Sequence, residues 1–202
     1  MRRFNLPLLV VLSCLCWMGC DSVTVMHPVG EPVVYGEIEL MESSIDAGRY
    51  LEGVWAGPKE SDLVVSVTWV GKGNLRGSFI KWNDGELDLS DEFYIKLTRH
   101  EDAWYLNLYA PEEVEEKGYS FVRLLPTDED AVVLLMPRAG TFAQAVEEQR
   151  VAGEIENPGN PLTVKLTGTK DEIDALVRQD EVGTQFGFER PLLFRRVASP
   201  SQ

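Results

Sequence analysis

The residue types that most often carry catalytic chemistry are scarce in this chain. Only two of its 202 residues are histidines, His27 and His100. A hydrolytic triad needs a histidine base that a carboxylate orients, together with a nucleophile shielded from water. Glu101 and Asp102 follow His100 directly, but charged neighbours in a turn usually point into water, so we interpret this group as a solvated turn. The sequence has no Gly-x-Ser-x-Gly elbow, no His-Glu-x-x-His and no phosphate-binding loop, so it does not predict an enzyme.

Carboxylates are the other side chains that could do chemistry. They concentrate in two stretches, one with Asp84, Glu86, Asp88, Asp91 and Glu92 and one with Glu112, Glu113, Glu115 and Glu116. Such a density of oxygen atoms could bind Ca²⁺, which takes about six to eight oxygen ligands. The spacing does not match an EF-hand loop, however, and like charges crowded in loops normally keep a surface hydrated. We therefore predict no metal and no cofactor, and a carboxylate pair for glycoside hydrolysis stays an open alternative.

The overall charge excludes one class of partner. The chain carries 33 acidic and 19 basic residues, a formal net charge of −14. No cluster of Lys or Arg offsets this charge, so the phosphate backbone of a nucleic acid would be repelled over most of the surface. We predict no nucleic-acid binding.

The first 20 residues have the composition of an export signal. Arg2 and Arg3 precede an apolar run from Leu6 to Met18. As a helix this run of about 13 residues would span roughly 20 Å, too short for a hydrocarbon core of about 30 Å. A basic start, a short apolar run and small residues are typical of a secretory signal. We predict that residues 1–19 are a signal peptide.

All three cysteines, Cys14, Cys16 and Cys20, lie in or at the edge of this segment. The pair Gly19-Cys20, which ends the apolar run, resembles the lipobox of bacterial lipoproteins. The resemblance implies that the Cys20 sulfur is acylated and anchors the protein to a membrane of the cell envelope, facing the periplasm or the exterior. It also implies a sorting role for Asp21. Plain secretion with cleavage after Cys14-Leu15-Cys16 is the alternative. With the anchor in place, we expect residues 20–48 to be a lipid-anchored tether that lifts the domain from the bilayer.

The remainder, residues 49–198, is expected to be a single β domain. Alternating runs such as Leu63-Val65-Val67-Trp69 recur every 10 to 14 residues with turn residues between them. This spacing predicts a mainly β fold, an antiparallel meander that closes into a barrel or a sandwich. Capping boxes at Thr141-x-x-Gln144 and Thr169-x-x-Glu172 predict two short helices late in the chain. Leu192 to Val197 is expected to form the closing strand.

The start of this domain carries a short motif, Gly53-Val54-Trp55. A Gly-x-Trp on the first strand of such a meander resembles the lipocalin superfamily. The resemblance implies a lipocalin-like barrel in which Trp55 plugs the closed end. It also implies a basic residue of the last strand lying across Trp55, with Arg195 or Arg196 as the candidate.

Aromatic residues on the expected strands are the candidate binding residues. In a barrel, inward-facing aromatic rings can line a pocket for an apolar ligand, and the candidates are Trp69, Phe79, Trp82 and Trp104. The same rings could equally fill a solid core. The sequence therefore leaves two functions open, a non-catalytic lipoprotein that binds a small apolar ligand and a packed structural lipoprotein that docks onto another envelope protein.

Overall fold

The computed structural model describes residues 21–33, 37–39, 44–58, 63–83, 86–157, 161–178 and 188–198. The expected signal peptide and Cys20 lie outside the described residues. None of the described helices is long and apolar enough to cross a bilayer.

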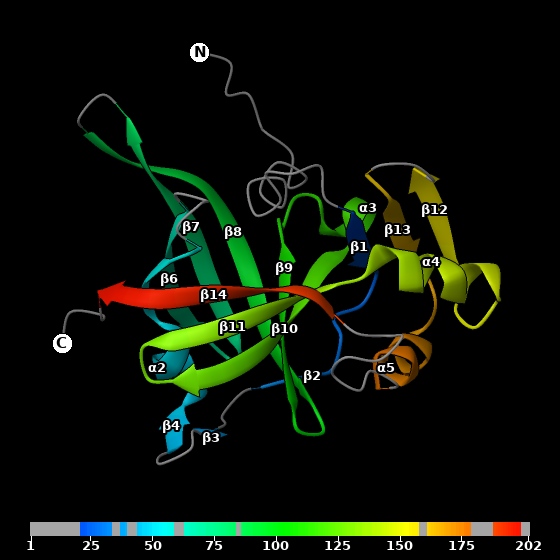
Figure 1. The fold of residues 1–202 in the computed structure, drawn as a ribbon, viewed down its shortest axis with the longest axis horizontal. Helices are drawn as coiled ribbons and strands as arrows, with labels where there is room; N and C mark the ends of the chain where they lie inside the picture. The colour runs from blue at the N-terminus through cyan, green and yellow to red at the C-terminus, as the bar shows by residue number, and fades with distance from the viewer. Residues whose placement is uncertain are drawn as a thin grey trace.

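Eight antiparallel strands form a closed barrel, which confirms the predicted fold class (Figure 1). The strands are β5 (Gly53–Ala56), β6 (Val64–Gly71), β7 (Asn74–Asn83), β8 (Glu86–His100), β9 (Ala103–Tyr109), β10 (Tyr119–Asp128), β11 (Ala131–Pro137) and β14 (Phe188–Ala198). Strands β5 to β11 pair in chain order, and β14 closes the barrel between β11 and β5. The fold is therefore a meander whose last strand arrives after an insertion.

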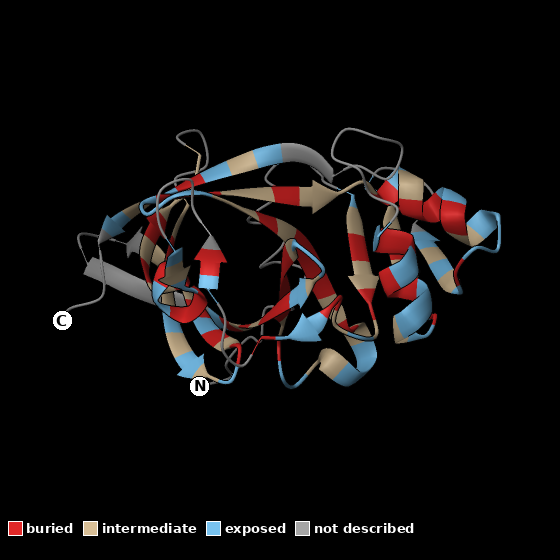
Figure 2. Cartoon of the chain, turned by 90° about the horizontal axis from the view of Figure 1, so that it is seen from below, coloured by how far each residue is buried: buried red, intermediate tan, exposed pale blue. Residues whose placement is uncertain are grey.

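Alternation along each strand decides what faces the interior. On β8, Phe93, Ile95 and Leu97 are buried in the barrel core, as the period of two predicts. On β11 both faces are apolar: Val132 faces the interior, while Ala131 and Leu135 are buried on the other side. Figure 2 shows buried residues at intervals along the strands that form the barrel.

The insertion and the N-terminal segment build a second layer on one side of the barrel (Figure 1). It contains α4 (Ala139–Glu147), β12 (Gly153–Asn157), β13 (Thr163–Leu166), α5 (Lys170–Arg178) and β1 (Ser22–Val25). Strand β1 pairs antiparallel with β10 and parallel with β13, so the barrel sheet continues into this layer. A second apolar cluster, which includes Tyr105 and Phe121 of the barrel wall, fills the space between them.

The expectation of a tether over residues 20–48 is wrong for the part of this segment that the structure describes. Val23, Val25, Val29 and Val33 are buried. The segment forms β1, β2 (Glu31–Pro32), β3 (Glu37–Glu39), β4 (Ser44–Asp46) and the start of α2 (Ala47–Leu51). Only β1 alternates, over four residues, and the other strands are two or three residues long, so the pattern along the sequence was too brief to indicate a folded segment.

The two late helices are present, but only one begins as predicted. In α5, Glu172 Oε2 accepts from the Thr169 backbone N–H at 2.8 Å, and Thr169 Oγ1 accepts from the Glu172 N–H at 3.3 Å, so the capping box is real. In α4 the helix begins at Ala139, which places Thr141 inside it rather than at the cap. A further short helix, α3 (Val114–Lys117), connects β9 to β10.

Candidate functional site

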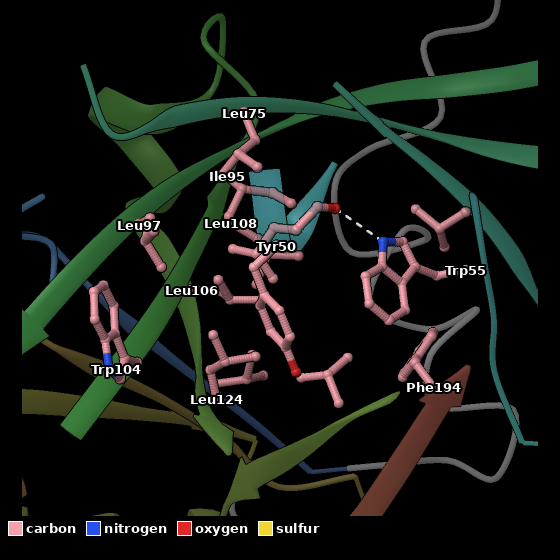
Figure 3. Packing of buried hydrophobic residues seen from close by; sticks show 14 of the residues in the cluster. Tyr50, Trp55, Leu75, Ile95, Leu97, Trp104, Leu106, Leu108, Leu124 and Phe194 are labelled. Carbon is pink, nitrogen blue, oxygen red and sulfur yellow. Dashed lines mark hydrogen bonds between the residues drawn. The ribbon is translucent and has the colours of Figure 1, made fainter. Parts of the chain in front are cut away.

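One end of the barrel is closed by α2 and the side chains around it. The Trp55 indole donates to the Leu51 carbonyl at 2.8 Å, a bond drawn as a dashed line in Figure 3. The Tyr50 hydroxyl crosses the interior and donates to the Ala131 carbonyl at 2.7 Å. Burial raises the pKa of Tyr50 to about 12, so this phenol remains a neutral donor at physiological pH. The helix and the far wall are thereby joined across the end of the barrel.

The arginine that lies over Trp55 is Arg196, whose guanidinium carbon is 4.4 Å from the ring centroid. The guanidinium also donates to the carbonyls of Tyr50, at 2.5 Å, and Glu52. Arg195, the other candidate, is exposed on the outer face of β14. Because side chains alternate along a strand, Arg196 shares the inner face with the buried Phe194, and Arg195 cannot.

Next to the plug formed by Trp55 and Arg196, the barrel holds an apolar cavity of about 80 Å³ that is partly open to the outside. Every described side chain that lines it is apolar, and the lining includes Trp55 at its base. Figure 3 shows how Leu106, Leu108 and Leu124 point from neighbouring strands into the same interior as Phe194. The lining residues are Leu51, Trp55, Val65, Val67, Leu75, Phe79, Phe93, Ile95, Leu106, Leu108, Val122, Leu124, Val132, Leu134, Met136, Leu192 and Phe194.

Of the four candidate aromatic residues, the structure places Phe79 at the cavity. Phe79 lines the cavity and packs on Phe93, with ring centroids 5.1 Å apart. Gly77 makes room for this pair, because a Cβ there would lie 2.3 Å from the Phe93 ring.

The tryptophans lie elsewhere. Trp69 packs against α2, where a Cβ on Gly48 would come within 2.7 Å of its ring. Trp104 is buried in the core beneath the Arg99 guanidinium, 5.3 Å from the ring centroid, and does not line the cavity. The side chain of Trp82 lies outside the described residues.

Most of the lining is aliphatic, and sequence reasoning centred on aromatic rings missed it. Val122 and Leu124 of β10, and Val132, Leu134 and Met136 of β11, contribute much of one wall. The alternation of Val122 and Leu124 with Arg123 would have indicated an inward face. Alternation could not have identified the inward side of β11, where both faces are apolar.

The cavity holds no described group that could transfer a proton or bind a metal. His100 lies elsewhere, where its Nε2 accepts from Arg178 Nε at 3.0 Å. Among the described residues no three His, Cys, Asp or Glu side chains are grouped as metal ligands. Asp21, the expected sorting residue, accepts from the Leu162 N–H at 2.8 Å, next to the starts of the parallel strands β1 and β13. What the described lining offers a ligand is apolar surface from which water is excluded.

No protein-family model, curated protein or solved structure gives a significant match to this chain.

Proposed function

We propose that this protein is a lipid-anchored protein of the bacterial cell envelope whose barrel binds a small apolar ligand without chemical conversion. The observation that carries the proposal is the apolar cavity above the Trp55–Arg196 plug. An apolar ligand placed there replaces water against side chains that cannot hydrogen-bond, which is favourable by about 25 cal/mol for each Å² removed from water.

The size of the cavity limits the ligand. At about 80 Å³ it exceeds the space that one water needs. It is smaller than the roughly 300–1,000 Å³ of pockets that hold drug-sized ligands. The proposal is therefore for a short or slender apolar molecule, and a bulkier one would have to displace flexible side chains such as Met136.

A matched pair of variants on β11 tests this proposal. Val132 lines the cavity, whereas its neighbour Val133 is half-buried and does not. Val132→Phe fills the cavity, so we expect at least a tenfold loss of affinity for a slender apolar probe such as 1-hexanol. Val133→Phe adds the same volume outside the cavity and should change affinity less than twofold.

The readout is isothermal titration calorimetry of the full-length protein with 1-hexanol, with thermal unfolding to verify that both variants fold. Absence of saturable binding to the wild type, or equal loss in both variants, would refute the interior site. In that case the packed-barrel alternative would be preferred.

The anchor has its own test, because it depends on one sulfur atom. Cys20→Ser is expected to abolish incorporation of labelled fatty acid and to release the protein from the membrane pellet. Two acyl chains are enough to hold a protein on a bilayer, at about 0.8 kcal/mol for each buried methylene. Cys16→Ser is the matched control and should retain both the label and the membrane association. An unchanged mass and unchanged pelleting of Cys20→Ser would exclude acylation at this residue.

A further inference from the structure

The described fold begins directly after the proposed anchor residue. Asp21 follows Cys20 in the chain, and its side chain accepts a hydrogen bond from the Leu162 backbone N–H at 2.8 Å. The Ser22 backbone N–H donates to the Leu162 carbonyl, also at 2.8 Å. The first two residues after Cys20 are therefore already bonded to the start of β13.

Strand β1 lies inside the sheet and not at its edge. It pairs in parallel with β13 along all four of its residues and antiparallel with β10 on its other side. Val23 and Val25 are buried in the second apolar cluster. Releasing β1 to act as a flexible linker would expose both valines and break its pairing with both neighbours, which is a costly local unfolding. The chain after Cys20 is thus part of a packed layer.

The length of chain between the anchor and the fold limits how far the membrane lies from the domain. A tether of 28 residues would reach roughly 90 Å when fully extended. Only one peptide bond separates Cys20 from Asp21, and it spans about 3.8 Å between Cα atoms. An acylated Cys20 therefore brings the bilayer to the place where β1 and β13 begin.

The surface at this place, which we call the anchor face, consists of Asp21, Ser22, Pro161, Leu162 and Thr163. Asp21 and Pro161 are exposed, and the other three residues are half-buried. The Ser22 hydroxyl donates to the Thr163 hydroxyl at 3.4 Å, and Asp21 is the one ionisable residue of the five. Small polar groups of this kind suit the hydrated headgroup layer. Electrostatic attraction is not needed to hold them there, because the buried acyl chains supply the binding free energy.

We propose that the anchor face rests on the membrane surface, so that the domain is attached directly to the bilayer by this end. The inference rests on the proposed acylation of Cys20 and adds to it the surface that the bilayer contacts. Strand β4 lies at the far end of the molecule from β1 and β13, so it points away from the membrane (Figure 1).

Because residues 21–202 contain no cysteine, single labels can report which end of the domain is close to the lipid. Cys14 and Cys16 leave with the expected signal peptide, and the acyl chain blocks the Cys20 thiol. Pro161→Cys places a label on the anchor face, and Ser44→Cys places the matched control on β4, both at exposed positions. Each full-length lipidated variant carries a thiol-reactive bimane in phosphatidylcholine vesicles with nitroxide-labelled headgroups, and thermal unfolding verifies that it folds.

We expect the nitroxide to quench the label at position 161 about threefold more strongly than the label at position 44, since one peptide bond cannot move the anchor face away from the headgroups. A twelve-residue Gly-Ser segment inserted between Cys20 and Asp21 restores a tether of roughly 20 Å. In that variant the difference between the two positions should disappear while the protein still pellets with the vesicles.

Two kinds of failure are distinguishable. Equal quenching at positions 161 and 44 in a protein that pellets with the vesicles would overturn the anchor face and leave the acylation intact. The same conclusion would follow if the Gly-Ser segment left the difference unchanged. Failure of the wild type to pellet would contradict the acylation of Cys20 itself, and the anchor face would fall with it.

Discussion

One side chain, that of Arg196, holds together the closed end of the barrel. The Arg196 side chain is 8% exposed, yet it contacts three backbone carbonyls, those of Tyr50, Glu52 and Glu129, as well as the Trp55 ring and the Asp130 carboxylate, 3.3 Å away. A planar guanidinium with five N–H donors can satisfy all of these at once, whereas a lysine ammonium could not stack in the same way. The plug therefore depends on the identity of one side chain.

Arg196→Ala is expected to lower the free energy of unfolding by about 2 kcal/mol, because the partly buried carbonyls of Tyr50 and Glu52 lose this donor. Arg195→Ala, on the exposed neighbour, should change it by less than about 0.5 kcal/mol. Urea denaturation of the two variants measures the difference. Similar values for both would contradict the role of Arg196 in the plug.

At the scale of elements, the N-terminal segment joins the barrel to the second layer. The Asn107 side chain on β9 accepts from the Val29 N–H at 2.8 Å. Asp174 of α5 accepts from the Gly30 N–H at 2.9 Å. Asp174 also pairs with Lys170 at 2.6 Å, and Lys170 with Glu31 at 2.7 Å. A chain segment with little hydrophobic pattern is thus fixed by buried polar contacts.

Asp174→Asn tests this attachment, because an asparagine can still accept from the Gly30 N–H but cannot pair with Lys170. Burial lowers the pKa of Lys170, but hydrogen bonds to Asp174 and Glu31 outweigh it and raise the pKa, which shows a favourable pair. We expect a loss of about 2 kcal/mol, since the lysine is left partly buried without its main partner.

Asp171→Asn, on the exposed face of the same helix, is the control. It should cost no more than about 0.5 kcal/mol through the helix dipole. Chemical denaturation compares the two, and an equal loss would show that the Asp174–Lys170 pair adds nothing to the attachment.

For the whole molecule, two apolar cores share one continuous sheet. The strands β9 and β10 contribute side chains to the barrel interior on one face and, through Tyr105 and Phe121, to the second layer on the other. This part of the wall is therefore buried on both faces, while the strands on the far side of the barrel expose apolar residues such as Val70 and Val197. The barrel therefore has one side that the second layer covers and another side that is exposed to solvent.

Alkaline pH should destabilise the whole molecule through Tyr50. Between pH 10 and 12 the unfolded chain loses this phenolic proton while the folded chain keeps it, because burial raises the pKa from 10.0 to about 12. Stability is therefore complete below pH 10 and falls as the pH rises, by about 2 to 3 kcal/mol in total. Urea denaturation from pH 9 to 12 measures this loss.

Tyr50→Phe has no proton to lose at this position and should show a smaller decline over the same range. Tyr109 and Tyr119 contribute in the same direction in both proteins, since their pKa values are also raised. A decline of equal size in wild type and variant would contradict the assignment to Tyr50.

Much of the barrel could be predicted because the alternation of inward and outward residues is visible within each long strand. Phe93, Ile95 and Leu97 face the interior because one side of a strand is buried and the period is two. The same rule separates Arg196 from Arg195 once Phe194 is known to face inward. It gives no answer on β11, where Val132 and Ala131 are both buried. On β1 the buried Val23 and Val25 do alternate with Ser22 and Thr24, but four residues are too few to separate a strand from a loop by pattern alone.

The candidate site was less predictable. Phe79 is large and lies on a strand, and it does line the cavity, but the same description fits Trp104, which does not. Whether a ring fills a core, covers a helix or borders a cavity depends on the strand opposite it, and that strand is distant in the sequence.

The sequence by itself determined the meander, the acidic character of the surface and the expectation of an anchor at Cys20. These follow from local composition and from the period of neighbouring residues. Only the tertiary structure decided that residues 22–33 belong to the fold, that Arg196 rather than Arg195 lies over Trp55, and that Tyr94, Tyr109 and Tyr119 from three strands meet on the outer wall. Each of these depends on contacts between segments far apart in the chain, for which the sequence has no local pattern.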